Sequence, residues 1–270
     1  MGTINDIDWD RIWLDSRLKR SCKCKGRKDW DRKAPSFAKR NIGSAYIDRL
    51  LQAVDPVAGD TVLDVGSGPG TLALPLAAMV RQVTAIDYST GMLDELKAAA
   101  SRQGIDNIAT VNASWEDDWQ KLGIEPHDIT VASRSMAVDD LGAALTKLDG
   151  WARKKVVITD RVGAGPFDPD IFAAIGRDFD PGPDYIITVN MLYRMGINAK
   201  VDYIPAEYSD SYATREEAVD SCLWMLDEMN PGERKRFEDY MDVRLVSLDD
   251  GTWRLPRRHD PKWAVISWEK

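Results

Sequence analysis

The chain has 270 residues, of which 44% are hydrophobic and 30% charged, and its formal net charge is −8. These values are typical of a globular protein with an ample core, and they disfavour nucleic-acid binding as a property of the whole surface. No apolar run reaches the roughly 18 residues that a membrane span needs, and the polar N-terminus does not resemble a signal peptide. Three cysteines, an odd number, argue against a disulfide framework and predict a reducing, cytoplasmic location.

The N-terminal part is predicted to form two helices joined by a basic loop. Apolar residues at helical spacing predict a helix over residues 5–20, and a second one over 35–51. Residues 21–33 show no periodicity, which predicts a loop. Between residues 17 and 40 eleven lysines or arginines stand against two acids, a local charge of +9, so this segment could bind phosphates.

Strand and helix patterns alternate from residue 61 to residue 160. The predicted strands are 61–65, 83–86, 108–112, 128–132 and 155–159, and the predicted helices are 72–79, 91–101 and 139–148. This alternation predicts an α/β fold, with a parallel sheet covered by helices on both faces. A ligand is expected beyond the carboxyl ends of the strands, near the first one.

After residue 160 the alternation becomes less regular. Residues 163–183 are rich in Gly, Pro and Asp and predict one helix around 171–177. Further helices are predicted at 185–195, 214–229 and 231–248, and further strands at 200–204 and 263–268.

A glycine-rich loop directly follows the first predicted strand. Asp64 lies near the end of that strand, and Gly66, Gly68 and Gly70 follow it. Such a loop at a helix N-terminus presents backbone N–H groups that favour an anionic ligand group. The dinucleotide-binding fingerprint requires glycine at its sixth position, where this chain has Thr71. The loop therefore departs from the dinucleotide pattern.

Polar residues also follow the next two predicted strands. Asp87 ends the second strand, where a carboxylate could accept hydrogen bonds from both hydroxyls of a ribose. Ser114, Trp115 and Glu116 follow the third strand, where a polar turn and an aromatic ring could hold an adenine by its edge and face. Together these residues predict a site for an adenosine-containing cofactor.

Residues 62–70, 87–93 and 112–115 resemble the successive motifs of class I S-adenosylmethionine-dependent methyltransferases, and most closely their small-molecule (type 11-like) branch. A further segment resembles the part of those enzymes that covers the cofactor: Trp30, Asp31, Ala34 and Phe37. The resemblance extends over roughly residues 30–160, and beyond them the chain matches only in outline.

The resemblance implies a set of cofactor-binding residues for S-adenosylmethionine and its product S-adenosylhomocysteine. The methionine part would contact Asp64, Gly66, Ser67, Gly68, Pro69 and Gly70. The ribose would be bound by Asp87, and the adenine would be flanked by Tyr88, Met92, Ser114, Trp115 and Glu116. Ser133 and Arg134 would lie near the sulfonium and the incoming acceptor.

The same resemblance implies a Rossmann-like sheet of seven strands, mostly parallel, with an antiparallel last strand. Residues 1–55 would form a helical cap and residues 56–270 the methyltransferase domain, with a helical insertion at about 214–248 that covers the substrate. The implied reaction is methyl transfer to a small-molecule acceptor. The sequence identifies neither the acceptor, nor the atom that is methylated, nor the oligomeric state.

Two alternatives remain open. One is a non-catalytic protein that binds S-adenosylmethionine and docks a partner, and the other is an RNA methyltransferase that uses the basic segment 17–40. Residues 132–136 lack the Asn/Asp-Pro-Pro-aromatic motif of adenine-N6 enzymes, and the Pro-Cys nucleophile of cytosine-C5 enzymes is absent from the sequence. Both departures disfavour methylation of a nucleic-acid base.

A general base cannot be assigned from the sequence alone. Tyr193, Asp139 and Asp160 are candidates because they are expected near strand ends, whereas His127 and His259 are predicted to lie in surface turns or loops.

No metal site is predicted. Cys22 and Cys24 supply only half of a typical zinc site, and no second Cys or His pair completes it. Cys222 lies in an apolar helical stretch and is predicted to be a core residue.

Overall fold

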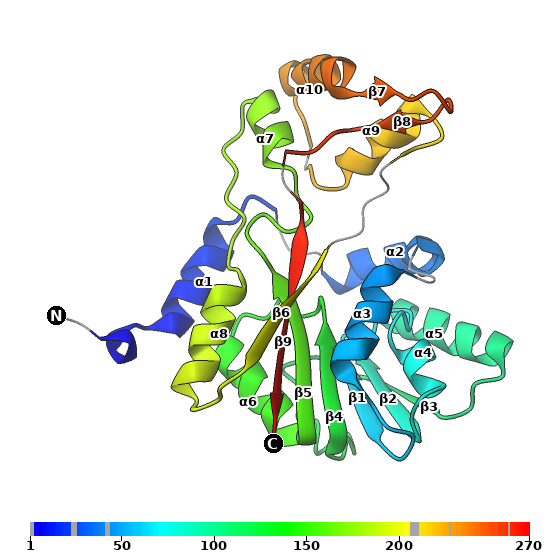
Figure 1. Ribbon diagram of the computed structural model, residues 1–270, viewed down its shortest axis with the longest axis vertical. Helices are drawn as coiled ribbons and strands as arrows, with labels where there is room; N and C mark the ends of the chain where they lie inside the picture. The colour runs from blue at the N-terminus through cyan, green and yellow to red at the C-terminus, as the bar shows by residue number, and fades with distance from the viewer. Residues whose placement is uncertain (1–2, 23–25, 41–43, 206–210, 227, 259) are drawn as a thin grey trace.

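The computed structural model describes residues 3–22, 26–40, 44–205, 211–226, 228–258 and 260–270. A seven-stranded sheet forms its centre, in the order β3-β2-β1-β4-β5-β9-β6 (Figure 1). The strands are β1 (Thr61–Val65), β2 (Gln82–Asp87), β3 (Ile108–Asn112), β4 (His127–Ser133), β5 (Ala152–Arg161), β6 (Lys200–Pro205) and β9 (Lys262–Glu269). Strands β1 to β5 pair in parallel, and β9 runs antiparallel to both β5 and β6. The predicted fold class and the antiparallel last strand are confirmed.

Helices cover both faces of this sheet (Figure 1). One face carries α1 (Trp9–Lys19), which follows the short 3-10 helix η1 (Ile4–Asp6), together with α6 (Leu141–Trp151) and α8 (Tyr185–Arg194). The other face carries α3 (Ala45–Val54), α4 (Ala73–Ala77) and α5 (Thr90–Gln103). Trp13 anchors α1 in the first core, where its indole N–H donates to the carbonyl of Val138 at 2.9 Å.

Strand β1 lies in the middle of the sheet and is buried along its whole length. A parallel strand that is covered on both faces is expected to be continuously apolar. Val62, Leu63 and Val65 meet this expectation, whereas Asp64 is a carboxyl group that is only 1% exposed. A buried acid at this position is costly for folding, and so it indicates a functional role.

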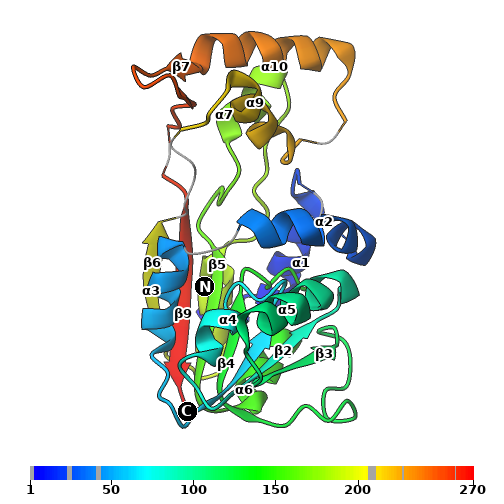
Figure 2. The ribbon, with the colours of Figure 1, turned by 90° about the vertical axis from the view of Figure 1, so that its right-hand side faces the viewer.

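A second group of elements, the upper lobe, lies beyond the carboxyl ends of the parallel strands (Figures 1 and 2). It consists of α7 (Pro169–Ile175), α9 (Arg215–Leu223), α10 (Pro231–Arg244), β7 (Val246–Ser247) and β8 (Trp253–Arg254). These elements share a separate apolar core that includes Ile171, Phe172, Cys222, Phe237 and Met241. The two helices predicted for 214–248 are present but shorter, because the chain after α10 turns into the β7–β8 hairpin.

The predicted loop over residues 21–33 is wrong from Arg27 onward, where helix α2 (Arg27–Arg40) begins. The helix was missed because few apolar residues mark it. A contact with a distant segment supports it instead, since Asp31 accepts hydrogen bonds from Ser89 and Gly91 at the start of α5. The predicted continuous helix over 35–51 is also divided, because α2 ends at Arg40 and Ser44 caps α3.

His127 is not a surface turn residue, which corrects the expectation from the sequence. It opens β4 and is buried, with Nε2 at 2.8 Å from the Thr84 hydroxyl on β2. Burial lowers the pKa of this imidazole. His259 lies outside the described residues.

The division into a cap (1–55) and a methyltransferase domain (56–270) stays a prediction. In the structure, α3 from the predicted cap packs against β6 and β9, and its Leu50 and Val54 are fully buried. Among the described residues, no helix is both long and apolar enough to cross a membrane.

Candidate active site

A cavity of about 700 Å³ lies at the carboxyl ends of the parallel strands, and residues of the sheet, of α1 and α2 and of the upper lobe line it. All the predicted cofactor-binding residues line it except Pro69 and Gly70. Segments that are far apart in the sequence meet here because the carboxyl ends of parallel strands share one edge of the sheet. The cavity is therefore the candidate active site.

The glycine loop after β1 is held tightly against its neighbours. The N–H groups of Gly66 and Ser67 both donate to the carbonyl of Ile86, at 2.8 and 3.0 Å. Gly66 has a φ of 71°, and a Cβ added to it would lie 2.4 Å from the Cβ of Ser135. Only glycine fits this turn, because a side chain would meet both steric and backbone strain.

Two buried side-chain oxygens beside this loop lack hydrogen-bond partners among the described residues. They are Asp64 Oδ2 and Ser67 Oγ. Burial, together with the nearby charge of Asp87, raises the pKa of Asp64 to about 7. Buried polar atoms are almost always paired in folded proteins, so these two oxygens indicate that a ligand with donor or cationic groups binds here.

Asp87 is fixed by hydrogen bonds on both of its carboxylate oxygens. Oδ2 accepts from the N–H of Gly68 at 2.9 Å, and Oδ1 accepts from the N–H of Ser89 at 2.8 Å. Burial raises the pKa of this carboxyl group, and the two backbone hydrogen bonds partly oppose that change. Asp87 therefore joins the glycine loop to the N-terminus of α5.

The turn after β3 supplies an aromatic wall of the cavity. The N–H of Ser114 donates to Asp117 at 2.7 Å, and the carbonyl of Ser114 accepts from the indole of Trp119 at 2.8 Å. Trp115 lines the cavity and also packs on the buried Trp119, with ring centroids 5.8 Å apart. Trp115 can thus contact a ligand with one side while the other side contacts the core.

The ends of β4 and β5 line the opposite part of the cavity, where Tyr46 connects them. The Tyr46 hydroxyl lies 2.9 Å from Ser133 Oγ and 2.9 Å from Thr159 Oγ1. The guanidinium of Arg134 lies over the Tyr46 ring, 4.6 Å from its centroid. Sequence reasoning missed Tyr46 and Thr159, because one lies on an amphipathic helix and the other within an apolar strand.

Only one of the three candidate general bases lines the cavity, and it is Asp160. It is buried, which raises its pKa, and it accepts hydrogen bonds from the Thr188 hydroxyl and the Arg161 N–H, each at 2.7 Å. Asp139 instead forms an ion pair with Arg17, and Tyr193 is 56% exposed outside the cavity.

The comparisons with known proteins agree with this geometry. The profile of a family described as "Methyltransferase domain" matches residues 62–154, the segment that contains the glycine loop, Asp87 and the turn after β3. The chain therefore carries a methyltransferase domain. It is an enzyme, a methyltransferase, and S-adenosylmethionine is its cofactor.

Relatives and solved structures extend the match beyond that segment. An uncharacterized protein of Haemophilus influenzae is 36% identical over 246 residues, which is 88% of each chain. The ribosomal RNA small subunit methyltransferase A of Xanthomonas euvesicatoria is 29% identical over 146 residues, and the match spans 48% of this chain and 53% of that relative. An S-adenosylmethionine-dependent methyltransferase of Geobacter sulfurreducens, solved with S-adenosylhomocysteine, has a TM-score of 0.53 at 16% identity, covering 88% of this chain and 96% of that one. A putative methyltransferase of Bacillus halodurans has a TM-score of 0.53 at 15% identity, and the match covers 84% of this chain and 99% of that one.

The residues around the glycine loop fit the cofactor of this methyltransferase. S-adenosylmethionine carries an ammonium and a sulfonium, and the unpaired oxygens of Asp64 and Ser67 are suited to cationic and donor groups. The individual roles assigned to the cofactor-binding residues remain predictions. Within the described part of the chain, no group of three or more His, Cys, Asp or Glu residues could hold a metal; Cys24 lies outside that part.

Proposed function

We propose that this methyltransferase transfers the methyl group of S-adenosylmethionine to a small-molecule acceptor. The observation that carries the proposal is the extent of the cavity, which continues past the glycine loop to the ends of β4 and β5 and up to the upper lobe. Its volume of about 700 Å³ lies within the range of roughly 300–1,000 Å³ that is typical of small-molecule sites.

Aromatic side chains from outside the central sheet support this proposal. They line the cavity from α1, α2 and the upper lobe: Trp13, Trp30, Phe37, Phe167 and Trp224. Bound S-adenosylmethionine supplies the methyl group. The chain would orient the acceptor along the line of transfer and exclude water, and these two effects provide most of the rate in such a reaction.

An RNA acceptor is the second candidate, favoured by the basic segment 17–40 and by the ribosomal RNA methyltransferase among the relatives. That relative is matched over only about half of its length. Four cations of the basic segment line the cavity, where they face a small-molecule site: Arg17, Arg20, Arg32 and Lys33. Two of them are already in ion pairs, Arg17 with Asp139 and Arg32 with Asp29. We therefore prefer the small-molecule acceptor.

The test uses S-adenosylmethionine with a radiolabelled methyl group and a cell extract divided into a small-molecule ultrafiltrate and an RNA fraction. We expect label to enter the ultrafiltrate in a reaction that the Asp87→Ala variant does not support. Label that appears only in RNA would overturn the proposal in favour of the second candidate.

A further inference from the structure

We propose that the acceptor is a small organic anion, with a carboxylate or phosphate on a planar apolar body, and that Arg20, Arg134 and Arg161 bind its charge. This inference rests on the proposed small-molecule function and goes further by naming the chemical class of the acceptor. It concerns the acceptor end of the cavity, which we define as the lining contributed by α1 and its C-cap residue, by the carboxyl ends of β4 and β5, and by the upper lobe.

Charge is distributed unevenly along the cavity. The acids Asp64, Asp87 and Glu116 line the glycine-loop end, where the cationic cofactor is expected. Among the described residues of the acceptor end, the one acid is Asp160, whose carboxylate is buried and already hydrogen-bonded to Thr188. The acceptor end has four arginines: Arg17, Arg20, Arg134 and Arg161. Arg17 is paired with Asp139, and the other three still exceed the one acid. Its excess of positive charge favours an anionic ligand.

Arg20 and Arg161 come from different elements, and both side chains lie beside Gly182. A Cβ added to Gly182 would lie 2.8 Å from Arg20 Cβ and 3.3 Å from Arg161 Nη2. Arg161 is held in place by donating to the carbonyl of Pro183 at 3.0 Å. Two like-charged side chains thus lie beside the same residue, and an anion bound next to them would offset the repulsion between their charges.

Arg20 and Arg134 retain capacity to bind a ligand. In the described part of the chain, the side chain of Arg20 has neither a hydrogen-bond partner nor an ion-pair partner, and it is half-buried. The guanidinium of Arg134 lies over the Tyr46 ring, and among the described residues it forms no ion pair with an acid. A planar guanidinium group matches the geometry of carboxylate and phosphate oxygens.

Aromatic rings next to these arginines suit a planar apolar body. Phe167 lies 5.9 Å from the Arg161 guanidinium, and its ring centroid is 5.4 Å from that of Trp224. Trp224 is 42% exposed, although it lines the cavity. A planar ligand would cover this surface and at the same time place its acidic group beside the arginines.

The experiment measures the binding of three probes to the full-length protein saturated with S-adenosylhomocysteine, by calorimetry at fixed ionic strength. Benzoate and phenyl phosphate carry the two anionic groups, and benzamide is the neutral match. We expect at least one anion to bind at least tenfold more tightly than benzamide, as charge-assisted hydrogen bonds allow. A preference between benzoate and phenyl phosphate identifies which anionic group the site selects.

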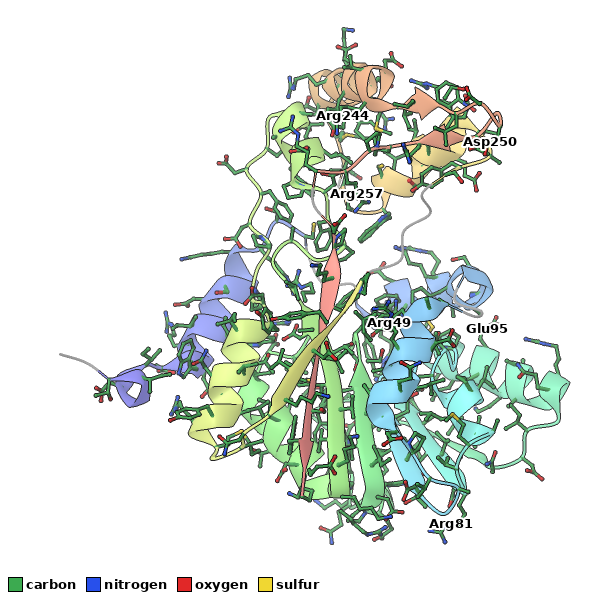
Figure 3. The ribbon with its side chains drawn as sticks, viewed as in Figure 1. Arg49, Arg81, Glu95, Arg244, Asp250 and Arg257 are labelled. Carbon is green, nitrogen blue, oxygen red and sulfur yellow. The ribbon has the colours of Figure 1, made fainter. Side chains whose placement is uncertain are left out.

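Arg20→Gln is the test variant, because the side chain of Arg20 has no hydrogen-bond or ion-pair partner among the described residues, and Arg81→Gln is its control. Arg81 is an exposed arginine that precedes β2 at the end of the sheet opposite the cavity (Figure 3). We expect Arg20→Gln to weaken binding of the preferred anion about tenfold and to leave benzamide unchanged. We expect Arg81→Gln to bind all three probes as the unchanged protein does.

The proposal is overturned if neither anion binds more tightly than benzamide, or if Arg20→Gln and Arg81→Gln bind the anions equally well. It is also overturned if Arg20→Gln affects only the binding of a single-stranded RNA. Labelling of the small-molecule ultrafiltrate tests the proposed function separately. A neutral labelled product in that fraction would contradict the anionic acceptor and leave the proposed function standing.

Discussion

The carboxylate of Asp31 accepts a hydrogen bond from the hydroxyl of Ser89 at 2.6 Å, and these two residues come from different parts of the molecule. Asp31 lies on α2 in the N-terminal segment, and Ser89 caps α5, two residues after Asp87. The same carboxylate also accepts from the N–H of Gly91 at 3.1 Å. The segment that borders the cavity is therefore attached directly to the cofactor side of the site.

Asp31→Asn should speed the release of S-adenosylhomocysteine several-fold, because an amide is a weaker acceptor than a carboxylate and α2 would separate more readily from α5. Stopped-flow displacement of the bound product measures this rate. Asp29→Asn is the matched control, since Asp29 lies on the same helix but its partners among the described residues, Gly26 and Arg32, belong to the same segment. Equal release rates in the two variants would show that the Asp31 contact does not retain the product.

Asp87→Asn should weaken binding of S-adenosylhomocysteine at least tenfold. The change removes the charge of a mostly buried acceptor, and hydrogen bonds to charged groups are worth about 1.5–3 kcal/mol. Calorimetry measures the affinity, and circular dichroism checks that the variant is folded. Asp94→Asn, on the exposed side of α5, should bind as the unchanged protein does. Unchanged affinity in Asp87→Asn would contradict its assignment to the ribose.

Gly66→Ala should destabilise the protein by roughly 2–4 kcal/mol, because the new Cβ would both require a strained φ and collide with Ser135. Gly104→Ala is the control, since Gly104 also has a positive φ of 67° but a Cβ there would meet no atom within 4 Å. It should cost only the backbone strain of about 1–2 kcal/mol. Urea denaturation measures both values. Equal losses would mean that the close approach to Ser135 is relieved by a small shift.

The raised pKa of Asp64 predicts how stability depends on pH. The unfolded chain releases this proton near the ordinary value of 3.8, whereas the folded protein keeps it to about 7. Between those values the folded state binds more protons, so this group lowers the free energy of unfolding as pH rises through that range. Asp64→Asn should remove this decline and be more stable than the unchanged protein above pH 7, as urea denaturation across the range would show.

The same residue predicts proton release on cofactor binding. A cationic ligand next to Asp64 favours its charged form and lowers its pKa. Near pH 6.5, binding of S-adenosylhomocysteine, which keeps the ammonium group, should release protons in the unchanged protein and fewer in Asp64→Asn. Calorimetry in buffers of different ionisation enthalpy counts these protons. Identical counts in both proteins would place the ammonium group away from Asp64.

The sequence by itself determined the central sheet and one side of the cavity. Strands and helices of the segment from β1 to β5 carry strong local periodicity, and the carboxyl ends of parallel strands meet at one edge whatever the loops do. Asp64, Gly66 and Asp87 could therefore be assigned to one site from the sequence alone. Local signals were weaker at α2, which has few apolar residues, and at His127, whose polar side chain resembled part of a turn.

Only the tertiary structure decided what surrounds the acceptor. The contacts Asp31–Ser89 and Phe167–Trp224, and the approach of Arg20 and Arg161 to Gly182, join segments that are far apart in the sequence. Each depends on the path of the loops between those segments. The path of a loop depends on how the elements that it connects pack together, as in the separate apolar core of the upper lobe. The hydrophobic periodicity of a single segment does not contain this information. For that reason the cofactor could be inferred from sequence motifs, whereas the anionic character that we propose for the acceptor became visible only when four arginines met at one end of the cavity.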